Sequence, residues 1–97
     1  MKINTIRHEI DMIDSDIIEL LSKRSTLVSA AGKTKKNRDQ VSDRDRVEKV
    51  IAKVKARAEK AGLDPSTAEM IYRNIINCFI QKEMKEFTAS SCELQDI

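Results

Sequence analysis

Residues that break helices are scarce in this chain of 97 residues, which has two Gly, one Pro and only 3% aromatic side chains. Together with 35% charged residues, this composition favours an all-helical fold over a sheet. So few aromatic residues predict a modest, aliphatic core, and a monomer of this size would be marginally stable. We therefore expect a single helical domain that gains stability from a partner.

Other absences exclude whole classes of protein. There is no apolar run long enough to span a membrane, no apolar signal segment at the start, no Gly-rich phosphate loop and no nucleophile elbow. Cys78 and Cys92 lie in a helical pattern and in a polar stretch, as expected for reduced thiols of a cytoplasmic protein. His8 has no second His or Cys near it, so we expect no metal site.

A heptad seam of apolar residues runs through the first third of the chain. Its members are Ile3, Ile6, Ile10, Ile13, Ile17, Leu20, Leu27 and Ala31. Their alternating steps of three and four predict one long helix from Ile3 to Lys36, with Asn4 or Thr5 as its N-cap. Such a helix would be about 50 Å long, and this chain alone could not cover its apolar face.

Cations interrupt the face that should be buried. Arg24 takes the seam position between Leu20 and Leu27, and Arg7 and Lys35 stand in the row beside it. Buried cations need a partner, which here would be a protein carboxylate or an anionic ligand. Arg24 and Lys35 would be about 16 Å apart and could converge on one small molecule. Arg7 would be about 42 Å from Lys35, so it could reach such a ligand only in a partner's site, as in a two-fold dimer.

A polar loop at residues 36–42 follows the first helix and is well placed to act as a lid. Ser42 or Asp43 would cap a second helix, and Gly62 would end it. Arg46 lies in the first turn of that helix, where the helix dipole disfavours a cation. A solvated charged turn and a ligand-binding turn both explain it.

Asp64 followed by Pro65 is a strong start signal for a third helix, whose apolar pattern continues to Phe87. We expect residues 1–87 to form one domain and the polar residues 88–97 to form a flexible tail.

Glu83 and Gly32 each have a structural and a functional interpretation. Glu83 lies on the apolar face of the third helix, where a lone Glu is more often an ion-pair partner than a catalytic group. Gly32 weakens the first helix by about 1 kcal/mol relative to Ala. It would provide either close helix contact or room for a ligand beside Lys35.

Several short motifs, in order over residues 3–87, resemble the all-helical class of chorismate mutase. They are Ile6-Arg7-x-x-Ile10-Asp11-x-Ile13-Asp14, Leu20-Leu21-x-x-Arg24, Gly32-Lys33-x-Lys35, Val41-x-Asp43-x-Asp45-Arg46, Gly62-Leu63-Asp64, and Ile75-Ile76 with Glu83. The resemblance implies a three-helix fold, an intertwined homodimer with a long N-terminal helix, no cofactor, and a cytoplasmic role in chorismate metabolism and aromatic amino acid biosynthesis.

The resemblance also implies roles for six residues, in sites shared between subunits. By position, Arg24 and the partner subunit's Arg7 match the arginines that hold the two carboxylates of the substrate. The remaining matches are Lys35 with the lysine at the ether oxygen, Arg46 with a further arginine, Asp43 with an acidic residue near the ring substituent, and Glu83 with a position that is commonly Gln and sometimes Glu.

The chemistry of chorismate suits this assignment. Arg binds carboxylates in a bidentate fork, and the Claisen rearrangement to prephenate is unimolecular, with no need for a nucleophile, metal or cofactor. The enzyme must hold a compact conformer and stabilise negative charge on the ether oxygen as its C–O bond breaks. Lys35 and Glu83 would be the catalytic pair, and Glu83 could donate a hydrogen bond only when protonated.

Two departures from the pattern point to relatives on the same fold. Many mutases have Glu directly after the matched Arg46, whereas this chain has Val47 and then Glu48, and the usual Arg before Asp43 is Ser42. Both features resemble isochorismate pyruvate lyase, which makes salicylate. Enzymes acting on aminodeoxychorismate share the fold too. We favour chorismate mutase over these relatives.

Two interpretations are not enzymatic. The cations Lys33, Lys35, Lys36, Arg38, Arg44 and Arg46 could form a nucleic-acid patch. Interleaved aspartates, the lack of stacking aromatic residues nearby and a net charge of only +2 argue against it. A simple helical dimerisation module would explain the seam but not Arg24.

Overall fold

The computed structural model describes residues 2–33 and 43–95, with side chains for 2–33 and 43–86. Within this part the chain forms three helices and no strand: α1 (Ile3–Gly32), α3 (Arg44–Ala61) and α4 (Pro65–Gln95). The prediction of an all-helical, three-helix fold is confirmed. The expected loop at 36–42, and Lys35 before it, lie outside the described residues.

Helix α1 begins at Ile3, as predicted, but its N-cap differs from the one expected. The N-cap is Lys2, whose side chain makes no capping bond and whose carbonyl oxygen accepts hydrogen bonds from the amides of Thr5 and Ile6, both at 3.1 Å. The predicted cap at Asn4 or Thr5 is therefore wrong. Ile3 already belongs to the apolar seam, so the helical pattern begins at Ile3 without a side-chain cap.

Helix α3 begins and ends at the residues its sequence indicates. Asp43 is the N-cap, and its Oδ1 accepts a hydrogen bond from the amide of Arg46 at 3.1 Å. Gly62 ends the helix in the left-handed region with φ of 80°, which Gly adopts without strain. The amide of Leu63 then donates to the carbonyl oxygen of Ala58 at 2.9 Å, completing the C-terminal cap.

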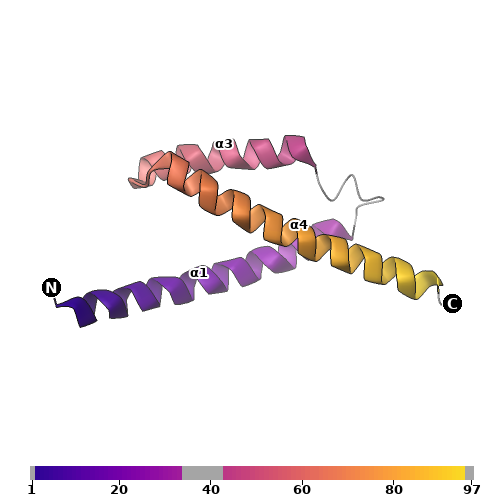
Figure 1. Cartoon of the computed structure of the whole chain (residues 1–97), viewed down its shortest axis with the longest axis horizontal. Coiled ribbons are helices and arrows are strands. Elements are labelled where there is room, and N and C mark those ends of the chain that lie inside the picture. The colour runs from indigo at the N-terminus through magenta and orange to yellow at the C-terminus, as the bar shows by residue number, and fades with distance from the viewer. Residues whose placement is uncertain (1, 34–42, 96–97) are drawn as a thin grey trace.

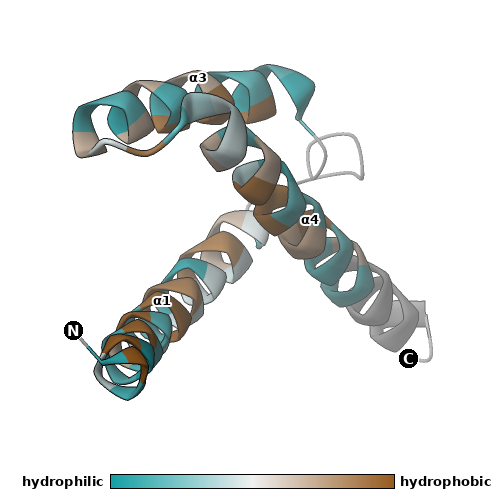
Figure 2. Cartoon of the chain, turned by 60° about the vertical axis from the view of Figure 1, so that its left-hand side comes forward, coloured by the Kyte–Doolittle hydropathy of each residue, from teal (hydrophilic) through white to brown (hydrophobic). Residues whose placement is uncertain are grey.

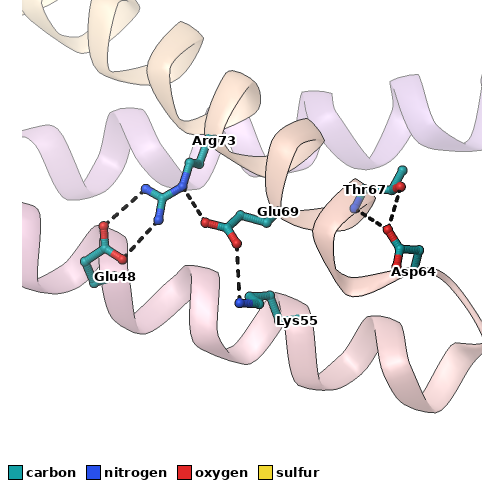
Figure 3. Close-up of polar contacts among 6 residues, drawn as sticks. All are labelled: Glu48, Lys55, Asp64, Thr67, Glu69 and Arg73. Carbon is teal, nitrogen blue, oxygen red and sulfur yellow. Dashed lines mark hydrogen bonds and ion pairs between the residues drawn. The ribbon is translucent and has the colours of Figure 1, made fainter.

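Helix α4 starts as predicted but runs further. Asp64 Oδ2 accepts hydrogen bonds from the amide and the hydroxyl of Thr67, at 3.0 and 2.9 Å (Figure 3). The helix continues to Gln95, past the end expected at Phe87, because residues 88–95 contain no Gly or Pro to break it. The flexibility of this stretch stays a prediction.

Helix α4 packs against both other helices, and most of its contact is with α3. The C-terminal part of α1 crosses α4, while the N-terminal half of α1 extends away from the other two helices (Figure 1). The core is accordingly small. Among the described side chains, the buried apolar ones are Ile51, Ala58, Ala68 and Ile76.

An ion-pair network joins α3 to α4 on the surface (Figure 3). The Nη1 and Nη2 atoms of Arg73 donate to the two carboxylate oxygens of Glu48, each at 3.1 Å, and its Nε donates to Glu69 at 2.9 Å. Lys55 Nζ lies 3.4 Å from Glu69. The hydrogen bond from Arg73 and then that from Lys55 hold the pKa of Glu69 below its ordinary value.

The chain leaves much of its apolar surface uncovered. It exposes 8050 Å², whereas a compact monomer of this mass exposes about 5,600 Å². Its radius of gyration is 17.1 Å, against about 12.5 Å for a compact domain of this length. Ile3, Ile10, Ile13, Ile17 and Leu20 are all exposed, and they run along the arm formed by α1 (Figure 2). No helix in the described ranges is long and apolar enough to cross a bilayer.

Candidate active site

A cavity of about 340 Å³ lies where the C-terminal part of α1, the first half of α3 and the middle of α4 meet. This volume is within the range of small-molecule sites. Four charged side chains line it: Arg24, Asp43, Arg46 and Glu83. The other lining residues are Leu27, Val28, Ala31, Val47, Val50, Ile76, Phe79 and Ile80. Four of the six predicted site residues therefore share one largely apolar cavity.

Arg24 reaches this cavity from α1 and is half-buried. Its Nη1 is buried and has no hydrogen-bond partner within the described part of the chain. Its Cζ lies 4.8 Å from the ring centroid of Phe79 and 5.8 Å from that of Tyr72. Aromatic faces attract a cation but accept no ordinary hydrogen bond from it. A buried donor without an acceptor is costly. Arg24 is therefore suited to donate a hydrogen bond to an anionic ligand.

Asp43 and Arg46 bring the start of α3 to the same cavity. The capping bond between Asp43 Oδ1 and the amide of Arg46 fixes the first turn of the helix. Both side chains are exposed, so they stand at the mouth of the cavity. The site thus combines a half-buried cation inside with a second cation and a carboxylate at its edge.

Glu83 is the buried charged residue of the site, with 8% of its surface exposed. It lies beside α1, where a Cβ added to Gly32 would be 3.8 Å from its Cδ. The space next to Gly32 is therefore filled by the Glu83 side chain, which favours the helix-contact interpretation of this glycine. A methyl group at 3.8 Å is an ordinary van der Waals contact, so the space would accept Ala but little more.

Of the other two predicted residues, Arg7 does not line the cavity and Lys35 cannot be placed. Arg7 is exposed on the N-terminal half of α1, and the helical rise puts it about 25 Å from Arg24 along the axis. Lys35 lies outside the described residues. Their roles, with Arg7 acting in the site of a second copy, stay predictions.

Glu48, which comes one position later than the Glu of many mutases, does not line the cavity. Glu48 is held on the surface by Arg73, whereas Val47 lines the cavity. The wall after Arg46 is therefore apolar, and Glu48 does not replace the Glu that many mutases have at the preceding position.

A small polar cluster ties α1 to α4 one turn away from Glu83. Lys82 Nζ donates to Ser29 Oγ at 3.1 Å and also to Glu86. Ser29 Oγ in turn donates to the Glu86 carboxylate at 3.1 Å. The hydrogen bond from Lys82 is the main reason why the pKa of Glu86 is below its ordinary value. This cluster helps to fix how α1 crosses α4 beside the cavity.

Sequence reasoning missed the aromatic contacts of Arg24. Tyr72 and Phe79 are seven residues apart, which places them on one face of a helix. That spacing was visible in the sequence. Its relation to Arg24 was not, because the contact depends on where α1 crosses α4.

Comparison with known proteins identifies the family of this chain. Residues 6–84 match the family model for chorismate mutase type II, a range that contains all six predicted site positions. An isochorismate pyruvate lyase from Pseudomonas aeruginosa is 32% identical over 80 residues, which are 82% of this chain and 79% of that protein. The resemblance inferred from the sequence is confirmed. This chain belongs to the chorismate mutase type II family.

Proposed function

We propose that this chain is a chorismate mutase, which rearranges chorismate to prephenate. The observation that carries the proposal is the cavity itself, where Arg24, with a buried donor that has no partner in the described residues, faces a space shared with Arg46 and Glu83. A dicarboxylate with an apolar ring matches a cavity that has cations at two points and largely apolar walls.

In the proposed mechanism the protein positions the substrate and stabilises charge. Arg24 binds one carboxylate in a bidentate fork, and the apolar walls hold the ring and the side chain in a compact conformer. One C–O bond then breaks while one C–C bond forms in the same molecule, so no proton or leaving group passes to the protein. The negative charge that develops on the ether oxygen needs a hydrogen-bond donor in a dry site.

We propose that Lys35 and Glu83 provide that stabilisation. Lys35 would act as a cation, while Glu83 would donate a hydrogen bond in its protonated form. The position of Glu83, buried in the wall of the cavity, supports this role, because a donor there is shielded from water. Asp43, at the mouth of the cavity, would contact the ring substituent.

We also propose a homodimer in which each site uses residues of both copies. Two apolar surfaces in the described part of the chain are open to solvent. They are the seam on the N-terminal half of α1 and the groove between α3 and α4, which includes Val54, Leu63 and Ile71. In a two-fold dimer, the seam of each copy would cover the groove of the other copy. The partner subunit's Arg7 would then bind the second carboxylate, since Arg7 cannot reach the cavity of its own chain.

A second candidate function is isochorismate pyruvate lyase. It is favoured by the apolar Val47 at the wall where many mutases have Glu, and by the 32% identical relative of that name. Both reactions break the same kind of ether bond in a dicarboxylate, so the residues proposed above would serve either.

Separate incubation with chorismate and with isochorismate, followed by identification of the products, tests these proposals. Prephenate from chorismate supports the mutase, and salicylate with pyruvate from isochorismate supports the lyase. Arg24→Ala is the matched control, because it should abolish either activity. Turnover of neither compound by a folded, dimeric protein would contradict both.

A further inference from the structure

Most of the aromatic residues in this chain contact a single cation. The sequence has one Tyr and two Phe, and the rings of Tyr72 and Phe79 both lie within 6 Å of the Arg24 guanidinium, at 5.8 and 4.8 Å. In a chain with so few rings, this concentration at the cation of the cavity indicates a role beyond filling the core.

The geometry of a stacked guanidinium explains what the rings can do. A ring attracts the flat face of the cation, while the N–H donors of the guanidinium lie in its plane and stay directed away from the ring. A carboxylate partner would instead occupy those donors and compete with a ligand. The rings thus hold Arg24 without consuming the donors that an anion needs.

The two rings line two neighbouring cavities, which share Arg46 and Val50. Phe79 lines the cavity that contains Arg24, whereas Tyr72 lines a second cavity of about 590 Å³ between α3 and α4. Arg24 therefore contacts one ring from each cavity. This arrangement limits the directions in which its long side chain can turn.

We propose that Phe79 and Tyr72 are positioning residues that hold Arg24 toward the cavity before any ligand is bound. The consequence is tighter anion binding, because the ordering of a flexible side chain has already occurred. Phe79, with the shorter contact, has the larger effect. The link to catalysis rests on the proposed function, whereas the contact and its effect on anion binding do not.

The contact can be tested by NMR without any turnover. The Nε–Hε resonance of Arg24, assigned by its loss in Arg24→Lys, should be shifted upfield by the ring currents of Phe79 and Tyr72. Phe79→Leu should move it most of the way back, Phe79→Tyr should keep it, and Met70→Leu should leave it unchanged. Met70 is an exposed residue of α4 that lines neither cavity. An unshifted resonance in the native protein would overturn the proposal.

The effect on binding is measured by titration with malonate, a stable dicarboxylate, followed on the same resonance. Loss of the Phe79 ring should weaken binding about fivefold, the scale of a partly exposed cation–π contact, and Phe79→Tyr should restore it. With substrate, Phe79→Leu should raise KM by about the same factor and leave kcat nearly unchanged. Unchanged malonate binding in a folded Phe79→Leu protein would show that the rings are only structural. Absence of turnover in the native protein would contradict the proposed function alone.

Discussion

Arg24 shows how a residue can weaken a fold and serve a site. Its buried Nη1 has no acceptor among the described residues, so removal of the side chain takes away a cost as well as a contact. We expect Arg24→Ala to lower kcat/KM by about a hundredfold or more, because a bidentate carboxylate contact is lost. The melting temperature should change little or rise.

Arg24→Lys is the control for this prediction. It keeps the charge but not the fork, so its kcat/KM should fall between those of the native protein and Arg24→Ala. Thermal unfolding and steady-state kinetics on the same samples separate the two effects. If Arg24→Ala unfolds while its folded fraction keeps normal turnover, Arg24 is a structural residue.

Glu83 can donate a hydrogen bond to the ether oxygen only as a neutral acid. We therefore expect Glu83→Gln, which keeps a hydrogen-bond donor in the same place, to retain activity. Glu83→Ala should lose most activity. Loss of activity in Glu83→Gln, or full activity in Glu83→Ala, measured by steady-state kinetics on folded protein, would show that Glu83 only supports the structure.

At the scale of the helices, local rules explain what the sequence could predict. Asp43, Gly62 and the pair Asp64 and Pro65 act within their own turns, so the bounds of α3 and the start of α4 were readable. Arg24 and Glu83 were singled out by their placement on apolar faces, and Asp43 and Arg46 by the family resemblance.

Contacts that depend on how two helices pack together could not be predicted from the sequence. The sequence offers Glu48 several cations, and only the packing of α3 on α4 selects Arg73. The same applies to the rings against Arg24, and to Ser29 with Glu86. The N-cap of α1 was predicted wrongly for a different reason, since no side chain caps this helix.

The network of Arg73 with Glu48 and Glu69 should make the packing of α3 on α4 sensitive to pH. The pKa of Glu69 is lowered in the folded protein from 4.5, chiefly by its hydrogen bond from Arg73. The ionised Glu69 therefore contributes its full stabilisation when the pH is above its ordinary pKa. This contribution is lost as the pH falls through the lower pKa that Glu69 has in the folded protein. We expect Arg73→Leu to lower the melting temperature slightly at pH 7, and the difference from the native protein to vanish at acid pH.

The effect should be small, because these side chains are exposed and salt screens them. Lys49→Leu, on the same helix as Glu48 but outside the network, is the matched control and should show no such pH dependence. A loss of stability in Arg73→Leu that is equal at all pH values would point to packing of the aliphatic part of Arg73.

At the scale of the whole molecule, the separation of Arg7 from the cavity gives a direct test of shared sites. Arg7→Ala and Arg24→Ala homodimers should each be inactive. A heterodimer of the two variants has one site with both arginines intact and one with neither, so it should regain about half the native activity per dimer. No recovery in verified heterodimers would contradict the shared site, and would leave Arg7 without a role in catalysis.

The small core has a consequence for the life of the protein in a cell. With four buried apolar residues in the described part of a single chain, folding and association should be one event, so stability follows mass action. The melting temperature should rise with protein concentration in dilution series, and a constant value would contradict this coupling. Newly made copies would then be open to proteolysis until they form dimers. When expression is low, the amount of protein in the cell would fall more steeply than its rate of synthesis.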